Sequence, residues 1–133
     1  MPTISGAFDV TITPETLSDT AAQSGLGRLS LAKRYYGALE ASAQGEMLSV
    51  RAAVAGSAGY VALERLEGTL DGRHGSFYLQ HSGSMARGTP SLSVSVVPDT
   101  GTGQLQGLSG SLAIRVEDGK HYYDFTYDIA EAP

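Results

Sequence analysis

Hydrophobic and polar positions alternate along eight segments of the chain, which are separated by short stretches rich in glycine and aspartate. Successive side chains of a strand point to opposite faces, so this period of two predicts β-strands. The predicted strands cover residues 4–13, 28–40, 45–55, 59–70, 75–86, 91–98, 104–116 and 120–129, and no long helix is expected. Eight strands joined mostly by tight turns predict an all-β fold, a single eight-stranded antiparallel up-and-down barrel over residues 1–133. A two-sheet sandwich is the competing arrangement.

Two turn motifs set the expected strand pairing. The sequence EDGK around Asp118-Gly119 is the strongest hairpin signal, because a type I′ turn needs two positive φ angles that Asp-Gly adopts easily. It places Val116 opposite His121. In LDGRHG, at 70–75, a turn that pairs Thr69 with Ser76 places Glu64 opposite His81. The stretches RGTP at 87–90 and PDTGTG at 98–103 are further predicted reversals.

Each predicted strand has one apolar face, which we assign to the barrel interior because a small barrel fills its interior with side chains. The members of this face include Phe8, Val10, Ile12, Leu29, Leu31, Leu39, Leu48, Val50, Val54, Leu92, Val94 and Val96. Five ionisable residues share the face: Lys33, Glu46, Glu64, His81 and His121. All except Glu46 are expected toward one end of the barrel, a pattern that indicates a pocket. If the faces are inverted, Arg65 and Gln80 line the interior in place of Glu64 and His81.

Composition narrows the classes of function. The net charge of −5 argues against nucleic acid as a partner, because binding phosphates needs a basic surface. The absence of cysteine excludes disulfides and thiol nucleophiles. The N-terminal residues lack a secretory signal pattern and no stretch is apolar enough to span a membrane, so a cytoplasmic protein is expected.

Four stretches carry a resemblance to a known family: AKRYYGALEASAQGEMLS, GSAGYVALERLEGTLDGRHGSFYLQHSGSM, VVPDTGTGQLQGLSG and GKHYYDFTY. They resemble successive motifs of a bacterial family catalogued as domain of unknown function 3224, over residues 6–129. The resemblance implies a calycin-like barrel similar in fold to allene oxide cyclase and dirigent proteins, and it brings no established reaction. Some enzymes of that wider fold group close rings inside the barrel, but fold alone does not imply function. Related barrels often assemble, so the resemblance also implies a possible homo-oligomer.

Glu64 and His81 form the sharpest candidate for catalysis. A carboxylate beside an imidazole in an apolar wall has the tuned protonation that general acid–base chemistry requires. The alternative interpretation is the more common one for such pairs: Glu64 and His81 form a hydrogen bond that only satisfies their own polar groups. Residues of the same face are expected to bind a ligand: Lys33, Tyr35, Tyr60, Leu66, Phe77, Leu79, His121 and Tyr123. No metal or other cofactor is expected, since the three histidines lack the spacing of metal ligands.

Three hypotheses for function follow. The first is a cofactor-free isomerase, cyclase or lyase that acts on a small apolar molecule through Glu64 and His81. The second is a carrier or sensor that holds such a molecule unchanged. The third is a barrel filled by its own side chains, which an eight-stranded barrel is just wide enough to be.

Overall fold

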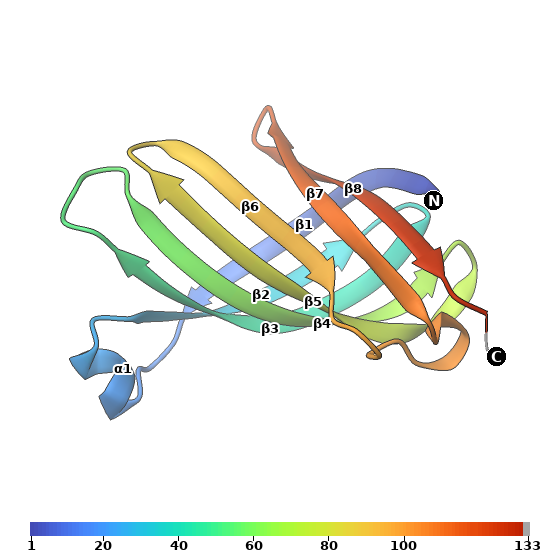
Figure 1. The fold of residues 1–133 in the computed structure, drawn as a ribbon, viewed down its shortest axis with the longest axis horizontal. Coiled ribbons are helices and arrows are strands. Elements are labelled where there is room, and N and C mark those ends of the chain that lie inside the picture. Colours follow the sequence, from blue (N-terminus) through green and yellow to red (C-terminus); the bar gives the residue numbers. More distant parts are fainter. Residues whose placement is uncertain (132–133) are drawn as a thin grey trace.

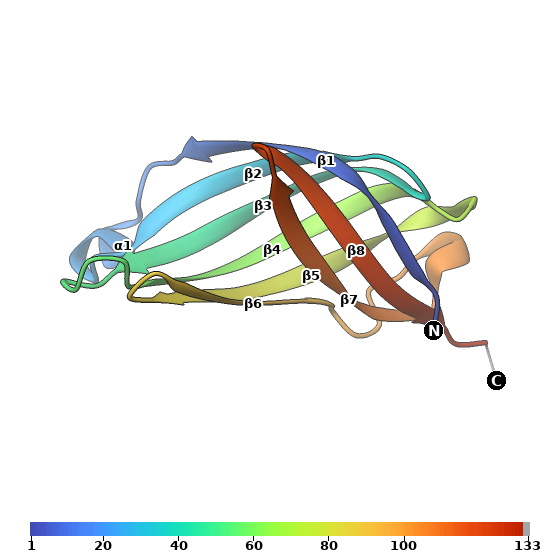
Figure 2. The same cartoon turned by 90° about the horizontal axis from the view of Figure 1, so that it is seen from above.

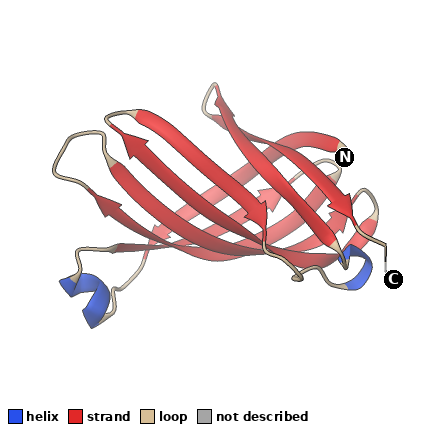
Figure 3. Ribbon diagram, in the orientation of Figure 1, coloured by secondary structure: helices blue, strands red, loops and turns tan. Residues whose placement is uncertain are grey.

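The computed structural model describes residues 1–131, and its eight strands form a closed antiparallel barrel in sequence order (Figure 1). This confirms the predicted all-β barrel. The strands, shown in red in Figure 3, are β1 (Thr3–Pro14), β2 (Gly27–Tyr35), β3 (Leu39–Arg51), β4 (Ala58–Leu70), β5 (Arg73–Ala86), β6 (Thr89–Val96), β7 (Leu108–Glu117) and β8 (Lys120–Ile129). No helix among residues 1–131 is long and apolar enough to cross a membrane.

Two short helices lie in the connections. α1 (Asp19–Gln23) follows β1, and the Ser18 side chain caps it by accepting a hydrogen bond from the Ala21 N–H at 3.1 Å. The 3₁₀ helix η1 (Gly103–Leu105) precedes β7. Neither helix is predicted from the sequence, and the predicted strand 104–116 begins within η1. α1 and the turn at 52–57 lie at the same end of the barrel in Figure 2.

The predicted strand 28–40 is wrong at its end. β2 ends at Tyr35 and β3 begins at Leu39, so a turn interrupts the predicted strand. Gly37 occupies this turn with a φ of 110°, a conformation that side-chain-bearing residues rarely adopt. The apolar–polar alternation continues across the turn and conceals it. β3 consequently starts six residues earlier than the predicted boundary at 45.

Three hairpins close through two-residue turns in which both residues have positive φ, as a type I′ turn requires: Asp71-Gly72, Arg87-Gly88 and Asp118-Gly119. The pairing of Val116 with His121 confirms the register predicted from EDGK. The register predicted from LDGRHG is wrong by two residues, since Thr69 pairs with His74. A shift of two residues keeps every side chain on its predicted face.

The face assigned to β3 is also wrong. Leu48 and Val50 point outward and are 42% and 46% exposed, whereas Ala41 and Ala43 are buried. Val54 lies beyond the end of β3 and is 47% exposed, and Ile12 on β1 is 51% exposed. In the middle of β3 the inward residues are small, and at position 45 the backbone of β4 leaves no room: a Cβ on Gly45 would lie 2.7 Å from the Cα of Glu64 and overlap the Leu63 carbonyl.

Glu46 also lies on the outer surface, which corrects its predicted inward position. The neighbouring strand supplies its partner: Glu46 Oε1 is 2.6 Å from Nε of Arg28. It is therefore an exposed ion-pair residue of the strand surface.

The two ends of the barrel differ in packing. At the end that bears the turns 36–38 and 71–72, here the closed end, large side chains fill the interior, among them Leu39, Leu66, Leu70, Phe77, Leu79, Leu105, Tyr123 and Phe125. Leu105 of η1 is 1% exposed, so the connection before β7 contributes to this core. The end that bears the turns 52–57 and 87–88 is here the open end. The two ends thus divide the barrel into a filled half and a half that contains space.

Replacing Gly45 with alanine tests the close approach of β3 to β4. The added Cβ overlaps backbone, so we expect Gly45→Ala to lower the free energy of unfolding by about 1–3 kcal/mol in urea denaturation. Gly59→Ala is the matched control, because its Cβ would have its nearest neighbour at 3.8 Å. Equal effects of the two substitutions would contradict the proposed crowding at Glu64.

Candidate functional site

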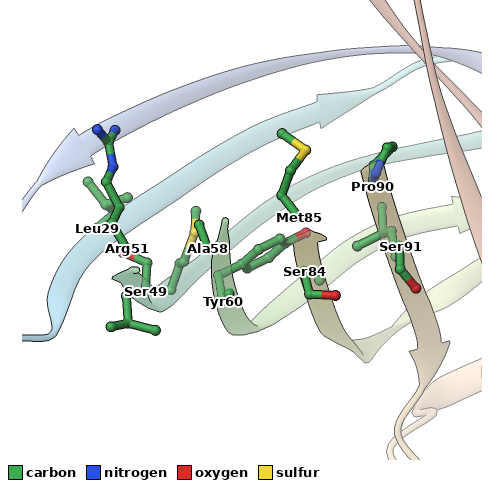
Figure 4. Close-up of a pocket in the computed structure, with 14 residues that line it drawn as sticks. Leu29, Ser49, Arg51, Ala58, Tyr60, Ser84, Met85, Pro90 and Ser91 are labelled. Carbon is green, nitrogen blue, oxygen red and sulfur yellow. The ribbon is translucent and has the colours of Figure 1, made fainter. Parts of the chain in front are cut away.

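A cavity of about 420 Å³ lies at the open end of the barrel (Figure 4). Its walls come mainly from β2 to β6, and most of the larger side chains are apolar: Leu29, Met47, Tyr60, Met85, Pro90 and Leu92. Arg51 is the charged residue of the lining among residues 1–131. The volume and the apolar walls are typical of a site for a small molecule.

Tyr60 connects this cavity to the ionisable residues of the interior. The Tyr60 ring lies over Gly83 of the neighbouring strand, where an added Cβ would overlap the ring. The Tyr60 ring centroid is also 6.4 Å from that of His81. Burial, with the nearby charge of Glu64, raises the pKa of the Tyr60 hydroxyl, which keeps it protonated. His81 is not itself a lining residue, so Tyr60 is the side chain of the cavity wall that lies next to it.

Glu64 is the centre of a buried polar group, here called the Glu64 network: Glu64 of β4, Lys33 and Tyr35 of β2, and His81 of β5. The Glu64 side chain is 1% exposed. Its Oε2 lies 2.7 Å from Lys33 Nζ and 2.7 Å from His81 Nε2. Its Oε1 accepts a hydrogen bond from the Tyr35 hydroxyl. Three donors from two strands thus converge on one carboxylate.

The environment of Glu64 keeps it ionised. Burial acts to raise the pKa of its carboxyl, but the hydrogen bond from His81 and the charge of Lys33 outweigh burial, so the pKa lies below the usual range. Burial and the charge of Glu64 raise the pKa of Tyr35 well above its usual value, so the phenol stays protonated and donates. Lys33 Nζ also lies 5.2 Å from the centroid of the Phe8 ring, a cation–π contact.

The hydrogen bond to Glu64 fixes the role of each His81 nitrogen. A carboxylate only accepts, so Nε2 carries the proton in that contact. Nδ1 has no hydrogen-bond partner within residues 1–131, yet no fully enclosed side-chain nitrogen or oxygen of these residues lacks one. Nδ1 must therefore touch space that water can enter. In the neutral ring this atom carries a free lone pair.

The predicted site residues fall into four places. Glu64, His81, Lys33 and Tyr35 meet in the Glu64 network, and Tyr60 lines the cavity. His121 is half-buried, with its ring centroid 5.2 Å from that of Phe8. The other predicted ligand-binding residues belong to the core of the closed end: Leu66, Phe77, Leu79 and Tyr123.

The question of which face lines the barrel is settled by burial. Glu64 and His81 are 1% and 3% exposed, whereas Arg65 and Gln80 are exposed on the outer surface. The two inward residues do not oppose one another, because Glu64 pairs with Leu79 and His81 with Ala62. They meet diagonally across the hairpin instead, a reach that long side chains have.

Sequence reasoning missed Met47 and Met85 as cavity residues. The inward face predicted from Leu48 and Val50 leaves Met47 on the outer face, and Met85 lies at the end of β5, where alternation is a weak guide. A signal that could have located the cavity wall is the glycine at 83, since a glycine within a strand often marks a close approach. No three histidine, aspartate or glutamate side chains of residues 1–131 are grouped as metal ligands would be.

A double-mutant cycle measures the coupling of Lys33 to Glu64. Removing one partner of a buried ion pair leaves the other charge uncompensated, so Glu64→Gln and Lys33→Met should each lower the free energy of unfolding by about 3 kcal/mol. The double variant should recover part of this loss, with a coupling of about 1–3 kcal/mol. The exposed pair Arg28 and Glu46, treated identically, should show a smaller coupling. Additive losses at Lys33 and Glu64 would contradict the network.

The lowered pKa of Glu64 also predicts a pH dependence. A carboxyl whose pKa is lower in the folded state stabilises the fold above its unfolded pKa, which is about 4.3 for glutamate. The difference in free energy of unfolding between wild type and Glu64→Gln should therefore be largest above that pH. It should shrink as the pH falls through the folded-state pKa. Urea titrations across the acidic range check this, and a difference independent of pH would count against an ionised Glu64.

Comparison with known proteins places the chain in a family. No curated protein matches it. A solved structure from Shewanella oneidensis MR-1, described as a protein with unknown function from the DUF3224 family, is 50% identical over 99% of both chains, with a TM-score of 0.92. The family described as "Protein of unknown function (DUF3224)" matches residues 4–127. The chain therefore belongs to the DUF3224 family.

Proposed function

We propose that the cavity at the open end binds a small apolar molecule and that His81, oriented by Glu64, moves a proton on it. The protein would then act as a cofactor-free isomerase, cyclase or lyase. The observation that carries the proposal is the position of His81 next to Tyr60 of the cavity wall, with Nε2 bound to a buried carboxylate and Nδ1 without a partner in residues 1–131.

The proposed chemistry follows from the two ring nitrogens. The lone pair of Nδ1 accepts a proton from a carbon of the bound molecule, and the ring becomes an imidazolium. Glu64 stabilises that cation through the Nε2–H, as a carboxylate does in other oriented histidines. For an isomerase or cyclase the imidazolium returns the proton to another atom of the same molecule, so no net proton is consumed. For a lyase it protonates the leaving group.

Lys33 and Tyr35 are positioning residues in this proposal. They touch Glu64 and keep it as an ionised, immobile acceptor, so the imidazole is held in one tautomer and one orientation. A general base works best when its geometry is fixed before the substrate binds. The apolar walls of the cavity support the same chemistry because they exclude water from the proton transfer.

A carrier or sensor of an apolar molecule is the second candidate. It is favoured by the hydrogen bonds of the Glu64 network, in which both carboxylate oxygens and the lysine already have protein partners. A ligand could occupy the cavity while meeting mostly apolar side chains. The cavity itself argues against a barrel that is filled at both ends.

Two probes separate these candidates. N-phenyl-1-naphthylamine, a neutral dye that fluoresces in apolar surroundings, reports binding. The ring opening of 5-nitrobenzisoxazole, which needs only removal of a proton by a base, reports proton transfer. We expect the wild type to bind the dye and to accelerate the ring opening. His81→Gln should reduce that acceleration by about 100-fold or more while dye binding remains.

His74→Gln is the matched control, because His74 lies on the same strand but on the exposed surface. It should leave both readouts unchanged. Equal ring-opening rates in wild type and His81→Gln would contradict the assignment of His81 as the base, and circular dichroism would verify that each variant is folded. Dye binding without any acceleration by the wild type would favour the carrier. Failure of the wild type to bind the dye would contradict both candidates.

A further inference from the structure

β6 and β7 leave a seam in the barrel wall. Among the described residues they pair only at Ser95 and Ser111, whereas every other neighbouring pair of strands has at least six paired positions. From that point β6 extends back to Thr89 and β7 extends on to Glu117, and the two strands diverge (Figure 1). The seam runs toward the open end and reaches the cavity, since Pro90 and Leu92 belong to its lining.

The two unpaired segments match in length. Counting six residues back from Ser95 along β6 reaches Thr89, its first residue, and counting six forward from Ser111 along β7 reaches Glu117, its last. If the ladder continued in the register of Ser95 and Ser111, the strands would end opposite one another. Beyond these residues each strand leads into a two-residue loop, Arg87-Gly88 before β6 and Asp118-Gly119 after β7.

The free edges carry backbone groups that fit this register. A two-residue hairpin loop closes with a hydrogen-bonded pair, and the direction of the backbone groups alternates from there. Leu92 on β6 and Ile114 and Val116 on β7 therefore point their backbone groups at the seam. In the continued register Leu92 opposes Ile114, which gives two hydrogen bonds. Pro90 opposes Val116 and gives one, because proline has no N–H.

Apolar side chains along the seam lie on the inward faces of β6 and β7 but remain exposed. Leu92 shares its face with buried Val94, and Val116 shares its face with buried Leu112. Leu92 and Val116 nevertheless are 43% and 61% exposed, although each lies on the inward face of its strand. Continued pairing would bring these faces together and remove apolar surface from water, which is favourable.

We infer that β6 and β7 close along this seam, from Ser95 and Ser111 out to Thr89 and Glu117, and that the closed ladder completes the side wall of the cavity. Opening the ladder admits a molecule from the side, and closing it excludes water. The missing N–H of Pro90 weakens the ladder, which keeps the open and closed states close in free energy. The same proline, at a free edge, disfavours pairing with a strand of another molecule. The role in admitting a molecule rests on the proposed function, whereas the closure itself does not.

Paired cysteines test the closure, because the chain has no cysteine of its own. In the continued register Thr89 and Glu117 are direct partners, and the Cα separation of such partners lies within the range of a disulfide. We expect the variant Thr89→Cys with Glu117→Cys to form an intramolecular disulfide under oxidised glutathione, measured by mass spectrometry and non-reducing electrophoresis. The register-shifted control, Thr89→Cys with Ala113→Cys, should form at least about tenfold less, because Ala113 would oppose Ser93, four residues away.

The cross-linked protein should exchange N-phenyl-1-naphthylamine at least about tenfold more slowly than the same variant after reduction with dithiothreitol, as expected of a gated site. Absence of the intramolecular disulfide, equal yields in the two cysteine pairs, or disulfides only between molecules would overturn the closure. An unchanged rate of dye exchange would overturn its role as the entrance. If the reduced variant and the wild type both fail to bind the dye, the proposed function fails, and the cross-linking yields still decide whether the seam closes.

Discussion

A carboxylate enclosed in an apolar barrel is stable as an anion only if other groups replace the water it has lost. In this protein Lys33, Tyr35 and His81 supply that replacement for Glu64, and each comes from a strand adjoining or near β4 in the barrel. The barrel interior differs on the two sides of this network. Toward the closed end the interior is packed with leucine and aromatic side chains, and toward the open end the side chains leave a cavity.

The network also explains features of the strands around it. β3 comes so close to the backbone at Glu64 that position 45 has no room for a side chain, and the preceding inward positions 41 and 43 carry alanine. The larger inward residues of β3, Leu39 and Met47, lie on either side of this stretch. Position 83 is similar, because the ring of Tyr60 occupies the space over that glycine. The glycine at 45 leaves room for the backbone at Glu64, and the glycine at 83 leaves room for the ring of Tyr60. Both glycines thus allow a close approach of neighbouring strands or side chains near the candidate site.

The sequence predicted well what depends on local pattern. Asp118-Gly119 leaves one turn type that fits, so the register of β7 with β8 followed from four residues. LDGRHG contains two plausible turn positions, and the choice of the wrong one shifted the register by two residues. Because a shift of two preserves the face, Glu64 and His81 were still placed together inside the barrel.

The parts that could not be predicted depend on neighbours in space. Near its end β3 carries Leu48 and Val50 on the outward face, where they are exposed, so the local alternation indicates the wrong face for this part of the strand. Lys33 and Glu64 lie 31 residues apart in the sequence, and no local pattern encodes their contact. The seam between β6 and β7 is likewise invisible in the alternation of either strand, because both have the pattern of fully paired strands.

The proposed role of His81 depends most on where its ring carries the proton, since the carboxylate of Glu64 must hold Nε2–H and leave Nδ1 free for a bound molecule. Nitrogen-15 NMR of histidine-labelled protein at mildly alkaline pH measures this directly, with the His81→Gln variant to assign the signal. We expect a neutral ring with the proton on Nε2 and a Nδ1 shift typical of a nitrogen with a free lone pair. A ring protonated on Nδ1 and bare at Nε2 would place the proton on Glu64 instead and contradict the account.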